Sequence, residues 1–198
     1  MKIHNEVNQN KIAHTHYDIH PLIKNRWSPR SFKEDAVPED LVRTMLEAAS
    51  WAASSMNEQP WRYLVAHRPS TAFEKMIECL LPGNVPWAKK SAVMIISLAK
   101  KHFDKNGKEN RHAMHDVGSA NTTMLLQGVE LGVYGHMMGG FDMDKTIRSF
   151  DIDPEKFEVV CFIALGFLDS PNKLPEEYKK RELEPRERKP IDSFVEFL

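Results

Sequence analysis

The feature that most constrains the fold is a pair of short, almost uninterrupted apolar runs, AVMIISLA at residues 92–99 and EVVCFIALGFL at 158–168. Apolar runs of this length are typical of strands that are buried in a core. WRYLVAH, at 61–67, predicts a third strand because it is rich in aromatic and branched residues. The chain is therefore expected to contain a set of strands in its interior.

Helical periodicity marks the segments around these strands. VPEDLVRTMLEAASWAA (37–53) predicts an amphipathic helix, and TAFEKMIECLL (71–81) predicts a second. The longest helix is expected over about 110–132, where small residues on several sides favour contact with a partner subunit. A loop, GVYGHMMGGFD (132–142), and a short helix near 143–150 should follow. Because strands and helices do not alternate regularly, the pattern predicts an α+β fold.

The composition argues against several classes of partner. The 198 residues are 41% hydrophobic and 28% charged, and 27 basic residues balance 28 acidic ones, so no net charge attracts nucleic acid or anionic lipid. No apolar run approaches the roughly 20 residues that span a bilayer, and the first residues do not resemble a secretory signal. Cys79 and Cys161 lie among apolar neighbours, which favours buried thiols over a disulfide or a metal site. We expect a soluble, cytoplasmic protein.

Three segments are expected along the chain. Residues 1–17 are polar, include His14 and His16, and predict a flexible arm, with metal binding as the less favoured interpretation. Residues 18–170 carry the strands and helices of one domain. Residues 171–198 are rich in Pro and charge and have too few apolar residues for a core of their own. This C-terminal arm must lie over another surface or remain mobile. We expect it to wrap the partner subunit of a dimer and to add SFVEF (193–197) as a strand to the partner's sheet.

Two stretches have unusual local chemistry. SSMNEQPW (54–61) holds more small hydrogen-bonding groups than a surface turn needs, and it suits a flat ligand with polar edges. Four of the nine glycines lie between residues 132 and 140, where they permit positive φ and close approach of backbone N–H groups to a ligand. A helix C-cap explains Gly132, but it explains Gly139 and Gly140 much less well.

Two pairs of arginines could bind an anion. RWSPRSF places Arg26 and Arg30 on either side of Ser28, and PRERKP places Arg186 two residues before Arg188. Guanidinium groups bind phosphate in a bidentate manner. Without further evidence, however, the favoured interpretation of Arg26 and Arg30 is a solvated basic turn. The charged run that contains Arg186 and Arg188 would usually be a solvated face.

Other motifs are missing. The sequence has no GxGxxG after a strand, no GxxxxGK[ST], no GxSxG, and no CxxC or HExxH, which argues against a dinucleotide site of the Rossmann type, a P-loop, a hydrolase elbow and a zinc site. His112, His115 and Asp116 could chelate a metal from one helix face, but a solvated helix surface is favoured.

Taken together, the sequence resembles the FMN-dependent nitroreductase family from about Pro21 to the C-terminus. The resemblance depends on an ordered set of motifs: R-x-S-x-R at 26–30, S-S-x-N-x-Q-P-W at 54–61, GGFD at 139–142, a strand ending at Gly166, and R-x-R-x-P at 186–190. It implies a central, mostly antiparallel sheet flanked by helices. It also implies an intertwined homodimer with FMN in a cleft between the subunits.

The resemblance implies a set of cofactor-binding residues. The residues expected to hold the phosphate, the ribityl chain and the pyrimidine edge are Arg26, Trp27, Ser28, Arg30, Arg186 and Arg188. The residues expected to reach the flavin from the other subunit are Ser54, Ser55 and Asn57. A backbone N–H near the flavin N5 is expected from the loop that contains Met137, Gly139 and Gly140. Ala53 departs from the Pro of many members, and Gly139 from the Glu of some.

The acceptor is expected to stack near the same loop. Met137 and Met138 could adapt to flat acceptors because their side chains are flexible. His136 could hydrogen-bond an acceptor oxygen, although a structural imidazole is favoured.

The implied activity is reduction of electron-poor acceptors, such as nitroaromatics or quinones, by NADPH or NADH in a ping-pong order. No catalytic side chain and no metal are assigned, because the flavin carries the chemistry. Two alternatives stay open: a flavin-binding carrier or sensor without significant turnover, and a metal-binding interaction protein built on the histidines.

Overall fold

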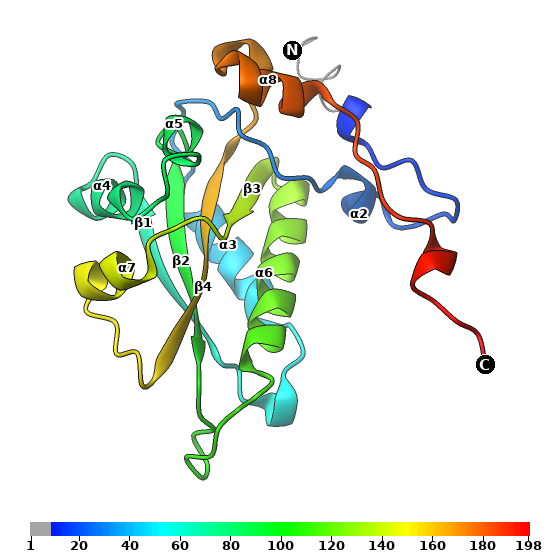
Figure 1. Ribbon diagram of the computed structural model, residues 1–198. Helices are drawn as coiled ribbons and strands as arrows, with labels where there is room; N and C mark the ends of the chain where they lie inside the picture. The colour runs from blue at the N-terminus through cyan, green and yellow to red at the C-terminus, as the bar shows by residue number, and fades with distance from the viewer. Residues whose placement is uncertain (1–8) are drawn as a thin grey trace.

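A four-stranded antiparallel sheet forms the centre of the computed structural model, which describes residues 9–198 (Figure 1). Strands β1 (Trp61–His67), β2 (Val93–Lys100), β3 (Val133–Met138) and β4 (Phe157–Phe167) lie in the order β1-β2-β4-β3. All three neighbouring pairs are antiparallel. The expected α+β class and antiparallel sheet are confirmed, and residues 1–8 of the expected N-terminal arm lie outside the described residues.

The two apolar runs form the two inner strands. β2 is buried along all but its last residue, and most of β4 is buried as well. Each inner strand is covered on both faces, which is why neither shows an alternation of apolar and polar residues. β1 and β3 lie at the outer edges of the sheet.

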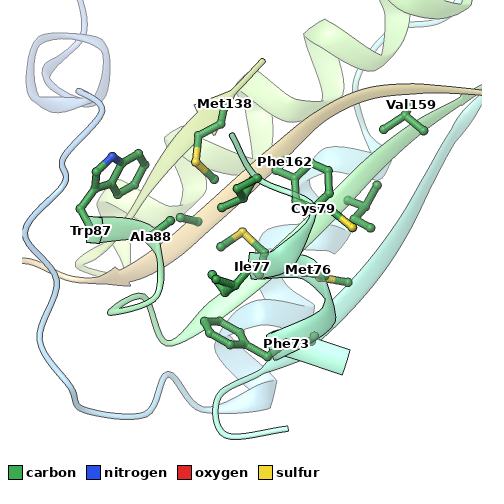
Figure 2. Close-up of a cluster of buried hydrophobic side chains, with 14 of the residues drawn as sticks. Phe73, Met76, Ile77, Cys79, Trp87, Ala88, Met138, Val159 and Phe162 are labelled. Carbon is green, nitrogen blue, oxygen red and sulfur yellow. The ribbon is translucent and has the colours of Figure 1, made fainter. Parts of the chain in front are cut away.

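Helices cover both faces of the sheet (Figure 1). One face carries α3 (Glu39–Ser50) and α6 (Ala113–Glu130), and the other carries α4 (Thr71–Glu78), α5 (Val85–Ala88) and α7 (Met143–Phe150). The core accordingly divides into two hydrophobic clusters. Figure 2 shows the cluster under α4 and α5, with Phe73, Met76, Trp87, Met138 and Phe162. Each large apolar side chain buried in this way contributes about 1.5–3 kcal/mol.

The cysteines have the environment that the sequence predicts. Cys79 and Cys161 are both buried and both free. Burial raises the pKa of the Cys161 thiol to about 12, so the thiol remains protonated and unreactive.

The prediction of a loop over residues 132–142 is wrong for residues 133–138. Residues Val133–Met138 form β3, which pairs with β4 from Val133 opposite Phe167 to Met138 opposite Phe162. The glycines made this segment look irregular, but Gly135 occurs within the strand because a Cβ there would lie 2.3 Å from Leu125 Cδ2. Long-range pairing with β4 therefore outweighs the local preference.

Three short helices were not predicted. They are α2 (Pro21–Asn25), α5 and α8 (Glu176–Leu183). α2 and α5, with five and four residues, are too short for a helical period to be recognised. α8 is mostly charged and buries only Tyr178 and Glu182, so it shows no apolar face. Single-turn 3-10 helices occur at Ser55–Asn57, Pro171–Lys173 and Ile191–Ser193.

The C-terminal arm lies over its own domain through α8. Tyr178 is buried and its hydroxyl donates to the carbonyl of Gly83 at 2.9 Å. Beyond α8 the apolar residues are not covered: Phe194 is 69% and Phe197 88% exposed. Residues 193–197 form no strand within this chain, so their pairing with a partner's sheet remains a prediction.

Candidate functional site

Three arginines from opposite ends of the chain meet beside α2. Arg26 follows α2 directly, and Arg186 and Arg188 follow α8. The Arg186 guanidinium donates to the carbonyl oxygens of Lys24 and Arg26, and Arg26 Nη1 lies 3.4 Å from Ser28 Oγ. The structure thus brings together residues that are 160 positions apart in the sequence.

These arginines line a cleft of about 640 Å³. Residues of the N-terminal segment, α2 and the C-terminal segment also line it, among them His14, Tyr17, Ile23, Ile191 and Phe194. The lining therefore includes basic, apolar and aromatic side chains, a combination that suits a ligand with a charged end and a ring.

The positive charge in this cluster is not balanced. No ion pair joins Arg26, Arg186 or Arg188 to an acidic side chain within residues 9–198. Burial, and then the charge of Arg188, lower the pKa of Arg26. Burial, and then Arg26 and Arg188, lower the pKa of Arg186. All three remain cationic, so an anion placed among them would relieve their repulsion.

One hydrogen-bond donor of Arg186 is unsatisfied. Its Nε is buried without a hydrogen-bond partner among the described residues. Buried donors are nearly always satisfied in folded proteins. A phosphate, with several acceptor oxygens, fits both this donor and the local charge. The residues present therefore fit the phosphate end of FMN.

Residues 26–30 are held against β3. Trp27 is 4% exposed and meets Tyr134 edge-on, with ring centroids 6.4 Å apart. The carbonyl of Pro29 lies 2.9 Å from His136 Nδ1. This segment is therefore positioned by the outer strand of the sheet, and Trp27 Nε1 is a second buried donor with no partner in the described chain.

His136 is fixed on the inner side of this segment. Its ring lies 4.5 Å from that of Trp87, and because a carbonyl only accepts, Nδ1 carries the proton that it donates to Pro29. Burial, and then the charge of Arg30, lower the pKa of His136 to about 4, so the ring is neutral near pH 7. These contacts favour the structural role, and the role toward an acceptor remains a prediction.

The Arg30 side chain does not share the cleft of the other arginines. Its guanidinium lies 5.8 Å from the centroid of the Trp87 ring, and Arg30 does not line the 640 Å³ cleft. The sequence grouped Arg26, Ser28 and Arg30, but the structure groups Arg26 with Arg186 and Arg188. The assignment of Arg30 to the pyrimidine edge remains a prediction.

The end of β3 offers backbone rather than side chains. Met137 is 38% exposed, whereas Met138 is 3% exposed and lies in the core shown in Figure 2, so the expectation that both methionines face an acceptor is wrong for Met138. Gly139 is exposed, and no atom lies within 4 Å of the position of a Cβ. The carbonyl of Gly140 accepts from the backbone N–H of Leu81 at 3.0 Å. As an outer strand, β3 can present N–H groups to a ligand.

Gly139 and Gly140 do not use the positive φ that glycine permits. The described glycines with positive φ are Gly107 and Gly132. Gly132, with φ 71°, follows the last turn of α6, as the C-cap interpretation predicts.

The stretch at 54–57 lies at the opposite end of α6. The Ser55 N–H donates to Asp116 Oδ2 at 2.9 Å, and Asp116 belongs to the first turn of that helix. Residues 26–30 lie beside β3, which follows the last turn. An 18-residue helix is about 27 Å long. One chain therefore does not bring Ser54, Ser55 and Asn57 to the arginine cluster.

The backbone of this stretch is strained. Met56, Asn57 and Gln59 have φ of 55°, 55° and 51°, unusual values for residues other than glycine. The buried Asp116 and the Ser54 hydroxyl, which accepts from the N–H of Gln59 at 3.0 Å, hold this shape. Strain of this kind costs about 1–3 kcal/mol per residue and gathers at functional sites.

Several residues around the site were missed by sequence reasoning. Trp87 supports both His136 and Arg30, and the buried Lys11 and Glu182 lie close to residues 26–31. Their roles depend on contacts between residues far apart in the sequence, so no local pattern could have identified them. Asp116 was considered only as a metal ligand; in residues 9–198 no group of three or more His, Cys, Asp or Glu could hold a metal. None of the described helices is long and apolar enough to cross a membrane.

Solved structures share this fold. An "oxidoreductase containing FMN" is 33% identical, covers 92% of each chain, and superposes with a TM-score of 0.87. A "putative nitroreductase in complex with fmn" from Desulfovibrio desulfuricans has the same fold, with 22% identity, a TM-score of 0.70, and coverage of 90% of this chain and 96% of that chain. The fold is therefore that of nitroreductases.

Sequence comparison gives the family. The Nitroreductase family model matches residues 23–167, and the chain belongs to this family. A similar relative, named "Putative NADH dehydrogenase/NAD(P)H nitroreductase", from Methanothermobacter thermautotrophicus, is 28% identical over 154 residues, which are 76% of this chain and 77% of the relative.

Proposed function

We propose that the protein is an FMN-dependent oxidoreductase that uses NADPH or NADH to reduce electron-poor acceptors such as nitroaromatics or quinones. The observation that carries the proposal is the cluster of Arg26, Arg186 and Arg188, which forms no ion pair with an acidic side chain within the described residues and lines a cleft beside α2. Two similar proteins support it. The 33% identical structure is that of an oxidoreductase containing FMN, and the archaeal relative is named for its use of NAD(P)H.

The chain supplies binding and orientation. The arginine cluster would hold the FMN phosphate, Trp27 and Ser28 would lie along the ribityl chain, and Arg30 would lie toward the pyrimidine edge. Backbone groups of Met137, Gly139 and Gly140, at the exposed end of the outer strand β3, would face the flavin N5. Bound FMN supplies hydride acceptance from NAD(P)H and hydride donation to the acceptor, in alternation at one open face.

The site is completed by a second copy of the chain. Ser54, Ser55 and Asn57 lie about one helix length from the arginines of their own chain, so the same flavin would receive them from the partner in a homodimer. This arrangement accounts for the strained, exposed shape of the 54–59 loop, which has no ligand to contact within its own chain.

No side chain is proposed to donate or accept a proton during hydride transfer. His136 is neutral near pH 7, and its ring is held by Trp87 and Pro29. Its proposed role is to support residues 26–30 beneath the site. A contact with an acceptor oxygen would require its Nε2 to be reachable from the cleft.

Absorbance spectroscopy tests the proposal. The apoprotein is loaded with FMN, and the visible flavin band is followed without oxygen as NADPH or NADH is added and then a quinone or a nitroaromatic. Loss of the band with nicotinamide and its return with the acceptor are expected. A carrier or sensor would bind FMN but leave the band unchanged, and a metal-binding protein would bind no FMN at all.

A further inference from the structure

Two charged side chains are buried where the N-terminal and C-terminal segments meet. Lys11 is 6% and Glu182 is 1% exposed. Burial of a charge costs several kcal/mol unless hydrogen bonds and opposite charges offset it. Both side chains hydrogen-bond backbone groups of another segment, so their contacts fix how these segments lie against each other.

Glu182 holds the segment that begins at Arg26. Its carboxylate accepts the backbone N–H of Arg30, at 2.9 Å and 3.2 Å, and that of Ser31 at 3.0 Å. Burial raises the pKa of Glu182, whereas these N–H groups and the charges of Arg30 and Lys11 act in the opposite direction. The bonds join α8 to the extended chain just after Ser28.

Lys11 holds the end of α8. Its ammonium group donates to the carbonyl of Arg181 at 2.8 Å and to that of Glu184, and it lies 5.3 Å from the centroid of the Trp27 ring. A cation at this point satisfies carbonyls that a helix leaves unpaired at its C-terminus. Lys11 therefore links the last turn of α8 to Trp27, the neighbour of Arg26.

Arg186 lies two residues after Glu184 and donates to the carbonyls of Lys24 and Arg26. The backbone between Glu182 and Arg186 is thus held at both ends against the segment that contains Arg26. Small shifts of this backbone would move Arg186 and Arg188 relative to Arg26.

We propose that Lys11 and Glu182 are positioning residues that set the spacing between Arg26 and the Arg186–Arg188 pair, so that the three guanidinium groups converge on one phosphate monoester. The inference extends the proposed function and depends on it. It gives the polar N-terminal segment a part in the cofactor site, although Lys11 does not itself line the cleft.

Comparison of FMN with riboflavin tests this inference, because the two differ only in the phosphate. Dissociation constants for both are measured by fluorescence titration of the apoprotein for the wild type, Glu182→Gln and Lys11→Met. Glu176→Gln is the matched control, since it removes the same charge from an exposed position of the same helix. Circular dichroism and gel filtration check that each variant is folded.

The wild type and Glu176→Gln should bind FMN much more tightly than riboflavin. Glu182→Gln and Lys11→Met should lose about tenfold in affinity for FMN, as expected when one charge-assisted contact is lost, and should keep their affinity for riboflavin. Equal weakening for both ligands, or an unchanged FMN preference in both variants, would overturn the inference and leave the proposed function standing. A wild type without any preference for FMN would overturn both.

Discussion

Arg188 is the residue whose removal tests phosphate binding most cleanly. Its only side-chain hydrogen bond to the described chain is to the carbonyl of Glu187, whereas Arg186 also holds the carbonyls of Lys24 and Arg26. Arg188→Ala should weaken FMN binding by roughly 1.5–3 kcal/mol, because a charge-assisted contact is lost. Arg186→Ala should weaken it at least as much.

Fluorescence titration with FMN measures both effects. Lys180→Ala removes one positive charge from an exposed position of α8 and serves as the control. If both single variants and the double variant bound FMN like the wild type, the arginines would be solvated charges and not a phosphate site.

His136 should make the stability depend on pH. Its pKa of about 4 in the folded protein lies below the ordinary value near 6.5 that applies in the unfolded chain. Between these values the unfolded chain binds more protons than the folded one, so the free energy of unfolding falls as the pH falls from about 6.5 toward about 4. His136→Asn keeps a donor for the Pro29 carbonyl but does not titrate, so the variant should lose the part of the pH dependence that His136 causes.

Urea denaturation of both proteins at about pH 7.5 and about pH 5 separates the effect of His136 on the free energy of unfolding from that of other titrating groups. The wild type should lose more stability between the two conditions than His136→Asn. Equal losses would mean that the ring is protonated in the folded protein and would remove it from the buried wall behind residues 26–30.

At the scale of elements, the contact between α6 and the start of β3 depends on a glycine. A Cβ at Gly128 would lie 2.5 Å from the Val133 carbonyl oxygen and 2.6 Å from Met45 Cε. Glycine-to-alanine changes inside helices usually stabilise by up to about 1 kcal/mol. At Gly128 the backbone oxygen has little room to move, so Gly128→Ala should instead lower the free energy of unfolding by about 1–3 kcal/mol.

Gly139→Ala is the control, because Gly139 has no atom within 4 Å of its Cβ position and no positive φ. It should change the free energy of unfolding of the apoprotein by less than about 0.5 kcal/mol. A Gly128→Ala variant as stable as the wild type in urea would contradict the close packing of α6 on β3.

Elements with strong local signals could be predicted from the sequence. The apolar runs identified β2 and β4, and helical patterns identified α3, α4 and α6. β3 was missed because its glycines hide a strand that only pairing with β4 stabilises. The short α8 was missed because its packing depends on two residues, Tyr178 and Glu182, whose partners are distant in the sequence.

The candidate site could be predicted only in part. The motifs identified Arg26, Arg186 and Arg188 as candidates for one anion, and the structure places them together. The sequence could not show that Arg30 turns toward Trp87, because side-chain direction there depends on α5. The sequence also could not reveal the roles of Lys11 and Glu182. Judged from their sequence neighbours alone, both charged side chains would be expected to lie in solvent.

At the scale of the whole molecule, the two parts of the proposed site lie apart in a single chain. The arginine cluster includes Arg26, whose neighbours Trp27 and Pro29 contact β3, the strand that follows the last turn of α6. The 54–57 loop lies at the first turn of α6 (Figure 1). The C-terminal segment extends away from the sheet (Figure 1), and its Phe194 and Phe197 side chains are exposed. A homodimer would cover these rings and bring each loop to the partner's arginines.

We propose that each flavin site is shared between two copies of the chain, and complementation between two defective variants tests this sharing. One variant carries Arg186→Ala with Arg188→Ala, and the other carries Ser54→Trp, which fills the space beside the loop. Each variant is prepared alone, and the two are also co-expressed with different tags and purified through both.

Neither variant alone should retain FMN. The doubly tagged dimer should bind about one FMN per dimer, because one of its two sites combines the intact arginines of one chain with the intact loop of the other. A doubly tagged dimer without FMN, or a Ser54→Trp protein that binds FMN like the wild type, would contradict the shared site.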